Sequence, residues 1–214
     1  MMLHPVEVQN ALDSMVILVD TREQDTPAFR RRMSRLPCEW RREMYNFGDY
    51  SAACTLPDGS LYSLNGLVAI ERKMSLDELS RNFTYSRKRF EREFGRMMDA
   101  DGKLYLLVEN ASWERVYGHK YKTRFDPKAY AASLCAWMAR YDTPIVFCQP
   151  ETAPILIHQI LYRELKERLL RLGGDDGEHE RWLYQTVSTA DALGMVSGCK
   201  HDETVSASHI DCQL

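Results

Sequence analysis

Residues 67–78 read LVAIERKMSLDE, and this stretch decides how the neighbouring chain folds. Its first half is apolar with charges gathered at the end, which predicts a buried strand. Ser75 and Glu78 form an S-x-x-E capping box, so we expect a helix to begin directly after the strand. Glu71 and Lys73 are two residues apart on that strand and should project from one face, while Arg72 should point the other way.

Two further acids stand at the ends of predicted strands. Residues 15–20 (MVILVD) form an apolar run that closes with Asp20, and Asp49 lies in Phe47-Gly48-Asp49-Tyr50, which leads into another strand. Ligand sites of open α/β sheets gather at strand ends. Phosphodiester hydrolysis needs a cation and an activated water. Oxygen ligands of this kind suit Mg²⁺, with Mn²⁺ as a substitute.

The remaining pattern predicts an α/β fold with a mixed central sheet flanked by helices. A turn at 56–60 joins two short strands, and the segment 111–125 has no clear period. We divide the chain into an N-terminal extension (1–14), a nuclease-type domain (15–172) and an acidic, poorly ordered tail (173–214). Helices are expected at 26–36, 85–98, 127–141 and from Thr152 to Gly173, with a short one at 180–186, and strands at 39–45, 103–109 and 144–148.

The net charge of −3 is unevenly distributed. From Asp175 onward there are eight acids and two bases, and removing them from the totals of 31 and 28 leaves 23 acids and 26 bases. The body of the chain is therefore mildly basic and compatible with binding phosphates.

Several classes of protein are disfavoured by the sequence. No apolar run approaches the length needed to span a membrane, and no secretory signal is visible. The six cysteines form no C-x-x-C pair, which favours reduced thiols over a zinc site. We therefore expect a protein that is not secreted, cytoplasmic if prokaryotic or viral and nuclear if eukaryotic.

The separation Asp49…Glu71-x-Lys73 matches the D…E-x-K arrangement of restriction-endonuclease-like nucleases. Alone this match is weak, because a solvated, charged strand end would look the same. Residues 19–23 (VDTRE), Gly48-Asp49, and Glu71-Arg72-Lys73 with Asp77 four residues beyond the lysine make it specific. In this order they resemble the nuclease domain of the XPF family of structure-specific endonucleases, over roughly residues 15–165.

The resemblance implies a magnesium-dependent endonuclease acting on branched or flapped DNA in repair, recombination or replication. Asp49 and Glu71 would be the firmest metal ligands, with Asp20 next. Lys73 would orient the attacking water, and Arg72 would contact the scissile phosphate or lock the acids. The implied catalytic set is Asp20, Glu23, Asp49, Glu71, Arg72, Lys73 and Asp77. Asp77 also has an ordinary interpretation as an acid in the first turn of a helix.

Basic and aromatic residues after the motif offer a surface for DNA. Phosphate contacts are expected from Arg22, Arg81, Arg87 and Lys88, and Tyr85 could stack on an unpaired base. Arg89, Arg92 and Arg96 lie on the same predicted helix. The alternative is a solvated helix with intrahelical pairs such as Arg87–Glu91 and Arg89–Glu93.

Two questions stay open at this stage. Family members usually carry a tandem helix-hairpin-helix module, and the acidic tail lacks its repeated hairpin glycines, so the chain resembles a stand-alone nuclease domain. The apolar stripe of the last long helix fits core packing, while the resemblance also implies a homodimer or a nuclease-complex partner. A different class of function is a non-catalytic DNA-binding or scaffold partner of a nuclease complex; the complete set of acids and Lys73 favours activity.

Overall fold

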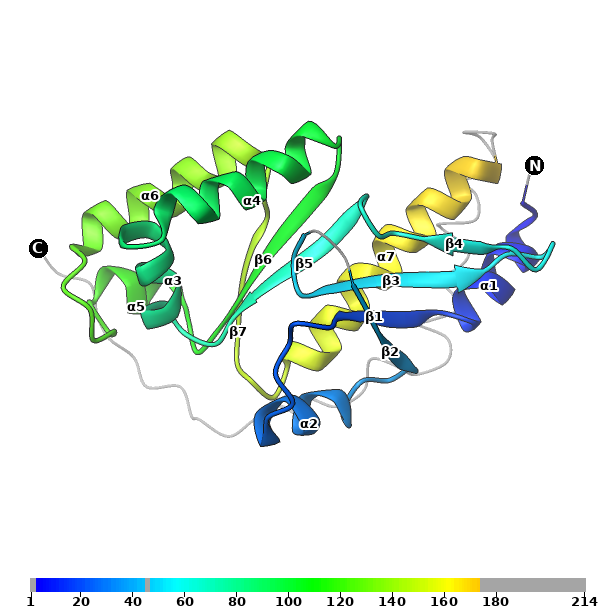
Figure 1. Cartoon of the computed structure of the whole chain (residues 1–214), viewed down its shortest axis with the longest axis horizontal. Helices are drawn as coiled ribbons and strands as arrows, with labels where there is room; N and C mark the ends of the chain where they lie inside the picture. The colour runs from blue at the N-terminus through cyan, green and yellow to red at the C-terminus, as the bar shows by residue number, and fades with distance from the viewer. Residues whose placement is uncertain (1–2, 45–46, 174–214) are drawn as a thin grey trace, which may run out of the picture. The chain divides into compact units, whose positions relative to one another are not determined.

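The computed structural model describes residues 3–44 and 47–173 (Figure 1). These residues form seven helices and seven strands. In chain order they are α1 (Pro5–Asp13), β1 (Val16–Asp20), α2 (Pro27–Met33), β2 (Trp40–Glu43), β3 (Tyr50–Thr55), β4 (Leu61–Ser63), β5 (Val68–Lys73), α3 (Leu76–Thr84), α4 (Arg87–Asp99), β6 (Lys103–Glu109), α5 (Trp113–Tyr117), α6 (Pro127–Tyr141), β7 (Ile145–Cys148) and α7 (Ala153–Gly173).

The strands form one mixed, seven-stranded sheet in the order β2-β1-β3-β5-β6-β7, with β4 paired to β3. Strand β3 is antiparallel to both of its long neighbours, β1 and β5. The pairs β1–β2, β5–β6 and β6–β7 are parallel. The start of β3 therefore meets the ends of β1 and β5 at one edge of the sheet, and the predicted mixed α/β sheet is confirmed.

Two hydrophobic clusters cover the two faces of the sheet. Residues Val68 and Ile70 of β5 pack into the cluster formed with α1, α2 and α7. Ala69, between them, faces the cluster formed with α3, α4 and α6. Figure 1 shows α4 and α6 lying side by side, while α7 runs near α1. The alternation along β5 thus sends successive side chains into different layers.

Local signals in the sequence account for the helix starts nearest the site. The Ser75 hydroxyl accepts a hydrogen bond from the Glu78 backbone N–H (3.2 Å), and the Glu78 carboxylate accepts one from the Met74 N–H (2.8 Å). Helix α3 therefore begins immediately after β5, as the capping box predicts. Thr26 caps α2 in the same way, accepting a hydrogen bond from the Phe29 N–H.

The structure adds two helices that the pattern did not predict. Helix α1 lies within the predicted N-terminal extension and packs on α7 and β3 through Val8, Ala11 and Leu12. Helix α5 is a single short turn inside the segment 111–125. Among the described residues, no helix is both long and apolar enough to cross a membrane. The predicted acidic tail and its short helix at 180–186 lie outside the described residues.

Candidate active site

Three predicted acids meet where β1, β3 and β5 come together. The Asp20 N–H donates to the Asp49 carbonyl (2.9 Å), and the Asp49 N–H donates to the Ile70 carbonyl (2.8 Å). These bonds place Asp49 between the end of β1 and the last residues of β5, where Glu71 follows Ile70. Asp20 and Glu71 are both buried. The backbone of the sheet therefore assembles the acids that the sequence separates by about 50 positions.

Gly48 is required by this close approach. Its φ of +66° is in the left-handed region, and a Cβ there would lie 3.0 Å from the Ile70 carbonyl oxygen and 3.0 Å from the Ala69 Cβ. Only glycine fits both the conformation and the space. The glycine of the Gly-Asp pair thus lets the chain turn tightly enough to bring Asp49 beside β5.

Glu71 and Lys73 project from the face of β5 that is covered by α3 and α4. The Lys73 ammonium donates a hydrogen bond to the Glu71 carboxylate, and both residues are buried. Burial alone would lower the pKa of Lys73, but the negative charges of Glu71 and Asp49 outweigh it and raise that pKa. Lys73 therefore stays protonated and balances part of the acidic charge.

Asp49 is held in an environment that disfavours its negative charge. Burial, followed by the neighbouring charge of Glu71, raises the pKa of Asp49 well above its ordinary value. Its carboxylate accepts one hydrogen bond from the Arg72 backbone N–H (2.8 Å), which only partly compensates. A divalent cation would relieve the repulsion between these acids, and carboxylate oxygens are the ligands Mg²⁺ prefers.

Asp20 and Glu23 have basic partners. The Arg22 guanidinium forms two hydrogen bonds with the Asp20 carboxylate (2.9 and 2.6 Å), and these raise the pKa of Arg22. Glu23 pairs with Arg32 on α2 (3.1 Å). Across residues 3–44 and 47–173, no group of three His, Cys, Asp or Glu side chains is arranged to hold a metal ion. Asp20 would have to exchange Arg22 for a metal in order to join Asp49 and Glu71.

Arg72 leaves β5 on the opposite face, as strand alternation predicts. Its guanidinium makes two hydrogen bonds to the Glu109 carboxylate (2.6 and 2.7 Å), away from Glu71 and Lys73. Arg32 lies 3.8 Å from Glu109 and also donates to the Tyr50 hydroxyl (2.9 Å). Of the two roles expected for Arg72, this geometry is that of a residue that fixes its surroundings, with its backbone N–H on Asp49.

Asp77 lies in the first turn of α3 and contacts a different segment. Its carboxylate accepts hydrogen bonds from the backbone N–H groups of Lys122 (2.6 Å) and Thr123 (3.2 Å). These contacts fasten the loop between α5 and α6 to the start of α3. Asp77 is not among the residues that line the cavity described next.

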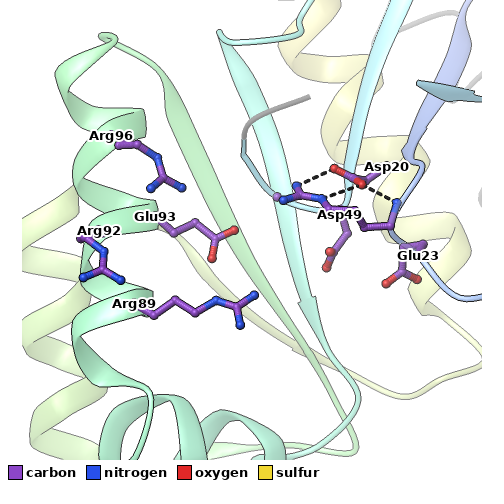
Figure 2. A pocket seen from close by; sticks show the side chains of 9 residues that line it. Asp20, Glu23, Asp49, Arg89, Arg92, Glu93 and Arg96 are labelled. Atoms are coloured by element: carbon purple, nitrogen blue, oxygen red, sulfur yellow. Dashed lines mark hydrogen bonds and ion pairs between the residues drawn. The ribbon is translucent and has the colours of Figure 1, made fainter. Parts of the chain in front are cut away.

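A cavity of about 360 Å³ opens between the acids and α4 (Figure 2). Figure 2 shows Asp20, Glu23 and Asp49 on one side, with Arg89, Glu93 and Arg96 reaching toward them from α4. The cavity therefore has an acidic wall at the end of β1 and the start of β3, without Glu71 of β5, and a predominantly basic wall on α4. Its lining residues are Asp20, Arg22, Glu23, Gly48, Asp49, Arg89, Arg92, Glu93 and Arg96.

The basic wall corrects the intrahelical pairing considered from the sequence. Arg87 does pair with Glu91 (3.0 Å), but none of the ion pairs among the described residues involves Arg89, Arg92 or Arg96. These three side chains are spaced so that they follow one side of α4. Of the five residues predicted to bind DNA, Arg22 lines the cavity, whereas Arg81, Tyr85, Arg87 and Lys88 do not. Tyr85 is 89% exposed and remains available to a ligand.

Glu93 is a cavity residue that sequence reasoning missed. In the sequence it stands four residues after Arg89 and looks like half of a surface ion pair. In the structure it shares a hydrogen bond with Glu71. Burial first, and then the charge and hydrogen bond of Glu71, raise the pKa of Glu93 to about 7. No local signal could have found this contact, because it joins α4 to β5.

Comparison with known proteins identifies the family. The model of the ERCC4 domain matches residues 19–158, which is more than half of the chain. The chain belongs to the ERCC4 domain family. This match contains every residue predicted at the site, and it confirms the XPF-type resemblance carried by the V-D-x-R-E, G-D and E-R-K-x-x-x-D motifs. The boundaries at residues 15 and 172, and the role of each site residue, stay predictions.

Solved structures place this ERCC4 domain among similar folds. XPF from Aeropyrum pernix is 19% identical, with a TM-score of 0.48, covering 76% of this chain and 63% of that chain. XPF from Aeropyrum pernix in complex with DNA is 20% identical, with a TM-score of 0.50, covering 79% of this chain and 72% of that chain. The second likeness establishes the fold. A comparison with curated proteins gives no match.

Proposed function

We propose that this ERCC4 domain is a divalent-metal-dependent DNA endonuclease. The observation that carries the proposal is the cavity with an acidic wall at the end of β1 and the start of β3 and a facing row of arginines on α4. Glu71 and Lys73 do not line this cavity, but Glu71 lies close enough to Asp49 for its charge to raise the pKa of Asp49. Membership of the ERCC4 domain family supports the same activity. A phosphodiester between the walls would meet a metal-binding edge on one side and cations on the other.

The residues that would hold the metal are Asp49 and Glu71, with Asp20 after it is released from Arg22. The donor set fits Mg²⁺, because it consists of carboxylates whose mutual repulsion a cation relieves. When bound, such an ion lowers the pKa of a coordinated water and offsets the charge that develops on the phosphate. Mn²⁺ is the proposed substitute.

The protein's own groups supply positioning and charge balance. Lys73, protonated beside Glu71, can orient a water molecule toward the phosphate and offset the acids. Arg89 and Arg96 can donate to the nonbridging phosphate oxygens, and these charge-assisted hydrogen bonds are the strong ones. Arg22, once it leaves Asp20, is a further phosphate ligand at the mouth of the cavity. Glu23 stays oriented by Arg32.

The proposed substrate class rests on the family resemblance. We propose branched or flapped DNA as the substrate, in repair, recombination or replication, and pairing of two copies or of this chain with a nuclease-complex partner. One of the similar solved structures is a complex of that protein with DNA, which supports DNA as the ligand. A non-catalytic DNA-binding partner would use the same arginines without needing Asp49 or Lys73.

The test is a cleavage assay with the full chain on labelled single-stranded, duplex, flap, fork and junction DNA. We expect nicking with Mg²⁺ or Mn²⁺ and none with EDTA. Asp49→Asn and Lys73→Ala should each reduce cleavage by at least about 100-fold, the scale on which single catalytic groups act. The favoured substrate in the panel identifies the branch that is recognised.

Matched controls separate a lost active site from a damaged fold. Asp58→Asn makes the same change at an exposed turn between β3 and β4, where the Asp58 carboxylate accepts two hydrogen bonds from Ser60. Lys103→Ala removes a lysine whose partner is Glu164 on α7. Both should cut like the wild type. No cleavage on any substrate, together with intact DNA binding, would favour the non-catalytic partner instead.

A further inference from the structure

A second, smaller hollow lies on the other side of β5 from Glu71. It has a volume of about 90 Å³ and is formed by α2, the end of β5 and the end of β6. We call it the α2 cleft. The charged residues of its lining are Arg31, Arg32, Arg35, Arg72, Glu109 and Glu151.

The floor of the α2 cleft is rigid and already neutralised. The side chains of Arg32 and Arg72 are only 7% and 13% exposed. Arg72 is held by both oxygens of Glu109, and Arg32 by Glu23 and the Tyr50 hydroxyl. Bidentate arginine–carboxylate pairs fix orientation as well as charge. The floor therefore presents fixed guanidinium edges and needs no further anion for its own stability.

The rim of the α2 cleft is different. Arg31 and Arg35 are four residues apart on the exposed side of α2 and its C-terminal end. None of the ion pairs found among the described residues includes either of them. Because both line the same small cleft, their positive charges repel each other. An anion bound between the two guanidinium groups would relieve this repulsion. Glu151 is the acid that lines the cleft beside them in the described part of the chain.

Two contacts join the α2 cleft to the proposed catalytic cavity. Glu23 lines the cavity, and its carboxylate is 3.1 Å from Arg32, which lines the cleft. Asp49 shows the same adjacency, because it accepts the backbone N–H of Arg72 while the Arg72 side chain enters the cleft. A chain of phosphates crossing this edge of the sheet would meet both hollows in succession.

We propose that the α2 cleft binds a second backbone phosphate of the DNA strand whose neighbouring phosphodiester lies in the catalytic cavity, an inference that rests on the proposed function. The volume admits a phosphate group, and the flat forks of Arg31 and Arg35 suit phosphate oxygens. Such a contact carries no base specificity. It sets which phosphodiester along the strand is presented to Asp49, Glu71 and Lys73.

The experiment measures DNA binding by the full chain, with Asp49→Asn added so that bound DNA is not cut. Fluorescence anisotropy is recorded at several salt concentrations for this chain and for the same chain with Arg31→Gln and Arg35→Gln. We expect about 10-fold weaker binding, and a slope of log affinity against log salt that falls by roughly 1 to 2, as for the loss of one or two phosphate contacts.

The matched control is Arg163→Gln with Arg171→Gln, which removes the same charge from two exposed arginines of α7. Neither of these residues has an ion pair within the described part of the chain. This pair should leave the affinity and salt slope within about 2-fold of the parent chain. Equal losses from the two double variants would overturn the proposal, because only net charge would then matter.

A scan of the DNA locates the phosphate. Single neutral methylphosphonate linkages are placed in turn along the strand, on DNA with hydroxyl ends and with a 5′-phosphate. At one internal linkage, the neutral group should weaken binding of the parent chain but not of the Arg31→Gln, Arg35→Gln variant. Dependence on the 5′-phosphate alone, or no such linkage, contradicts a backbone site. If the wild-type chain fails to cut any DNA, the proposed nuclease activity is refuted. The binding measurements would still show whether the α2 cleft binds a backbone phosphate.

Discussion

Glu71 and Arg72 are adjacent in the sequence, yet their side chains leave β5 on opposite faces and enter different surroundings. Glu71 turns toward Lys73 and Glu93 beside an open cavity, where like charges are forced together. Arg72 turns toward Glu109 in a closed network whose charges are paired. On the Glu71 side, neighbouring carboxylates repel each other, and a bound metal ion would relieve that repulsion. On the Arg72 side, the paired charges fix the end of β5, whose backbone N–H at Arg72 binds Asp49. The Glu71-Arg72-Lys73 motif thus contains residues of the proposed catalytic site and an arginine that stabilises the strand on which they lie.

The largest effect on stability is expected from the Arg72 side. Arg72→Ala removes the bidentate partner of the buried Glu109 carboxylate and leaves it with the more distant Arg32 at 3.8 Å, which costs about 3 kcal/mol in the free energy of unfolding. Chemical denaturation of the metal-free chain measures this loss. Arg87→Ala, at the exposed pair with Glu91, should cost no more than about 1 kcal/mol. Similar losses from both variants would mean that the Arg72–Glu109 network is not a support.

An intermediate effect is expected at Asp77, which tests whether the whole motif is catalytic. Asp77→Ala loses two hydrogen bonds to the segment at Lys122 and Thr123 and should destabilise the fold by roughly 1–2 kcal/mol. Asp77→Asn keeps an acceptor oxygen and should recover most of that stability. Both variants should retain metal-dependent cleavage. If Asp77→Asn is as inactive as Asp49→Asn while remaining folded, Asp77 belongs to the chemistry of the cavity.

The smallest effect concerns the charge of Glu93. Its pKa, ordinarily 4.5, is raised to about 7, so the folded chain binds this proton more tightly than the unfolded chain does. The contribution to stability is complete below the unfolded pKa and declines as the pH rises toward 7. In EDTA, Glu93→Gln should therefore raise the melting temperature by about 2–4 °C at pH 8, equivalent to roughly 1 kcal/mol. It should change little at pH 4.5. A gain that is constant across this range would contradict the raised pKa of Glu93.

The sequence predicts the elements that carry strong local signals. The apolar run before Glu71, the capping box at Ser75 and the Gly-Asp pair at 48–49 each have a backbone reason that acts over a few residues, and the corresponding strands and helix form. Strand alternation also gives the direction of Arg72. The family resemblance alone left two roles open for its guanidinium, contacting the scissile phosphate or locking the acids.

The missed features depend on contacts between distant segments. Glu93 looks like a partner for Arg89 on the helix surface, and only the packing of α4 against β5 turns it to Glu71. The α2 cleft needs Arg32 and Arg72 to meet at Glu109, across 77 positions of sequence. Helix α1 was missed because its apolar side is completed by α7 at the other end of the domain.

The proposed metal site is tested most directly by the rate of DNA cleavage as a function of Mg²⁺ concentration for the wild type, Glu71→Gln and Arg72→Lys. The two substitutions are neighbours in sequence and act on opposite faces of β5. We predict saturable, metal-dependent cleavage by the wild type, none by Glu71→Gln at any Mg²⁺ concentration, and retained metal dependence in a less stable Arg72→Lys chain. Cleavage by Glu71→Gln at the wild-type rate, or cleavage that persists in EDTA, would contradict a catalytic metal site that includes Glu71.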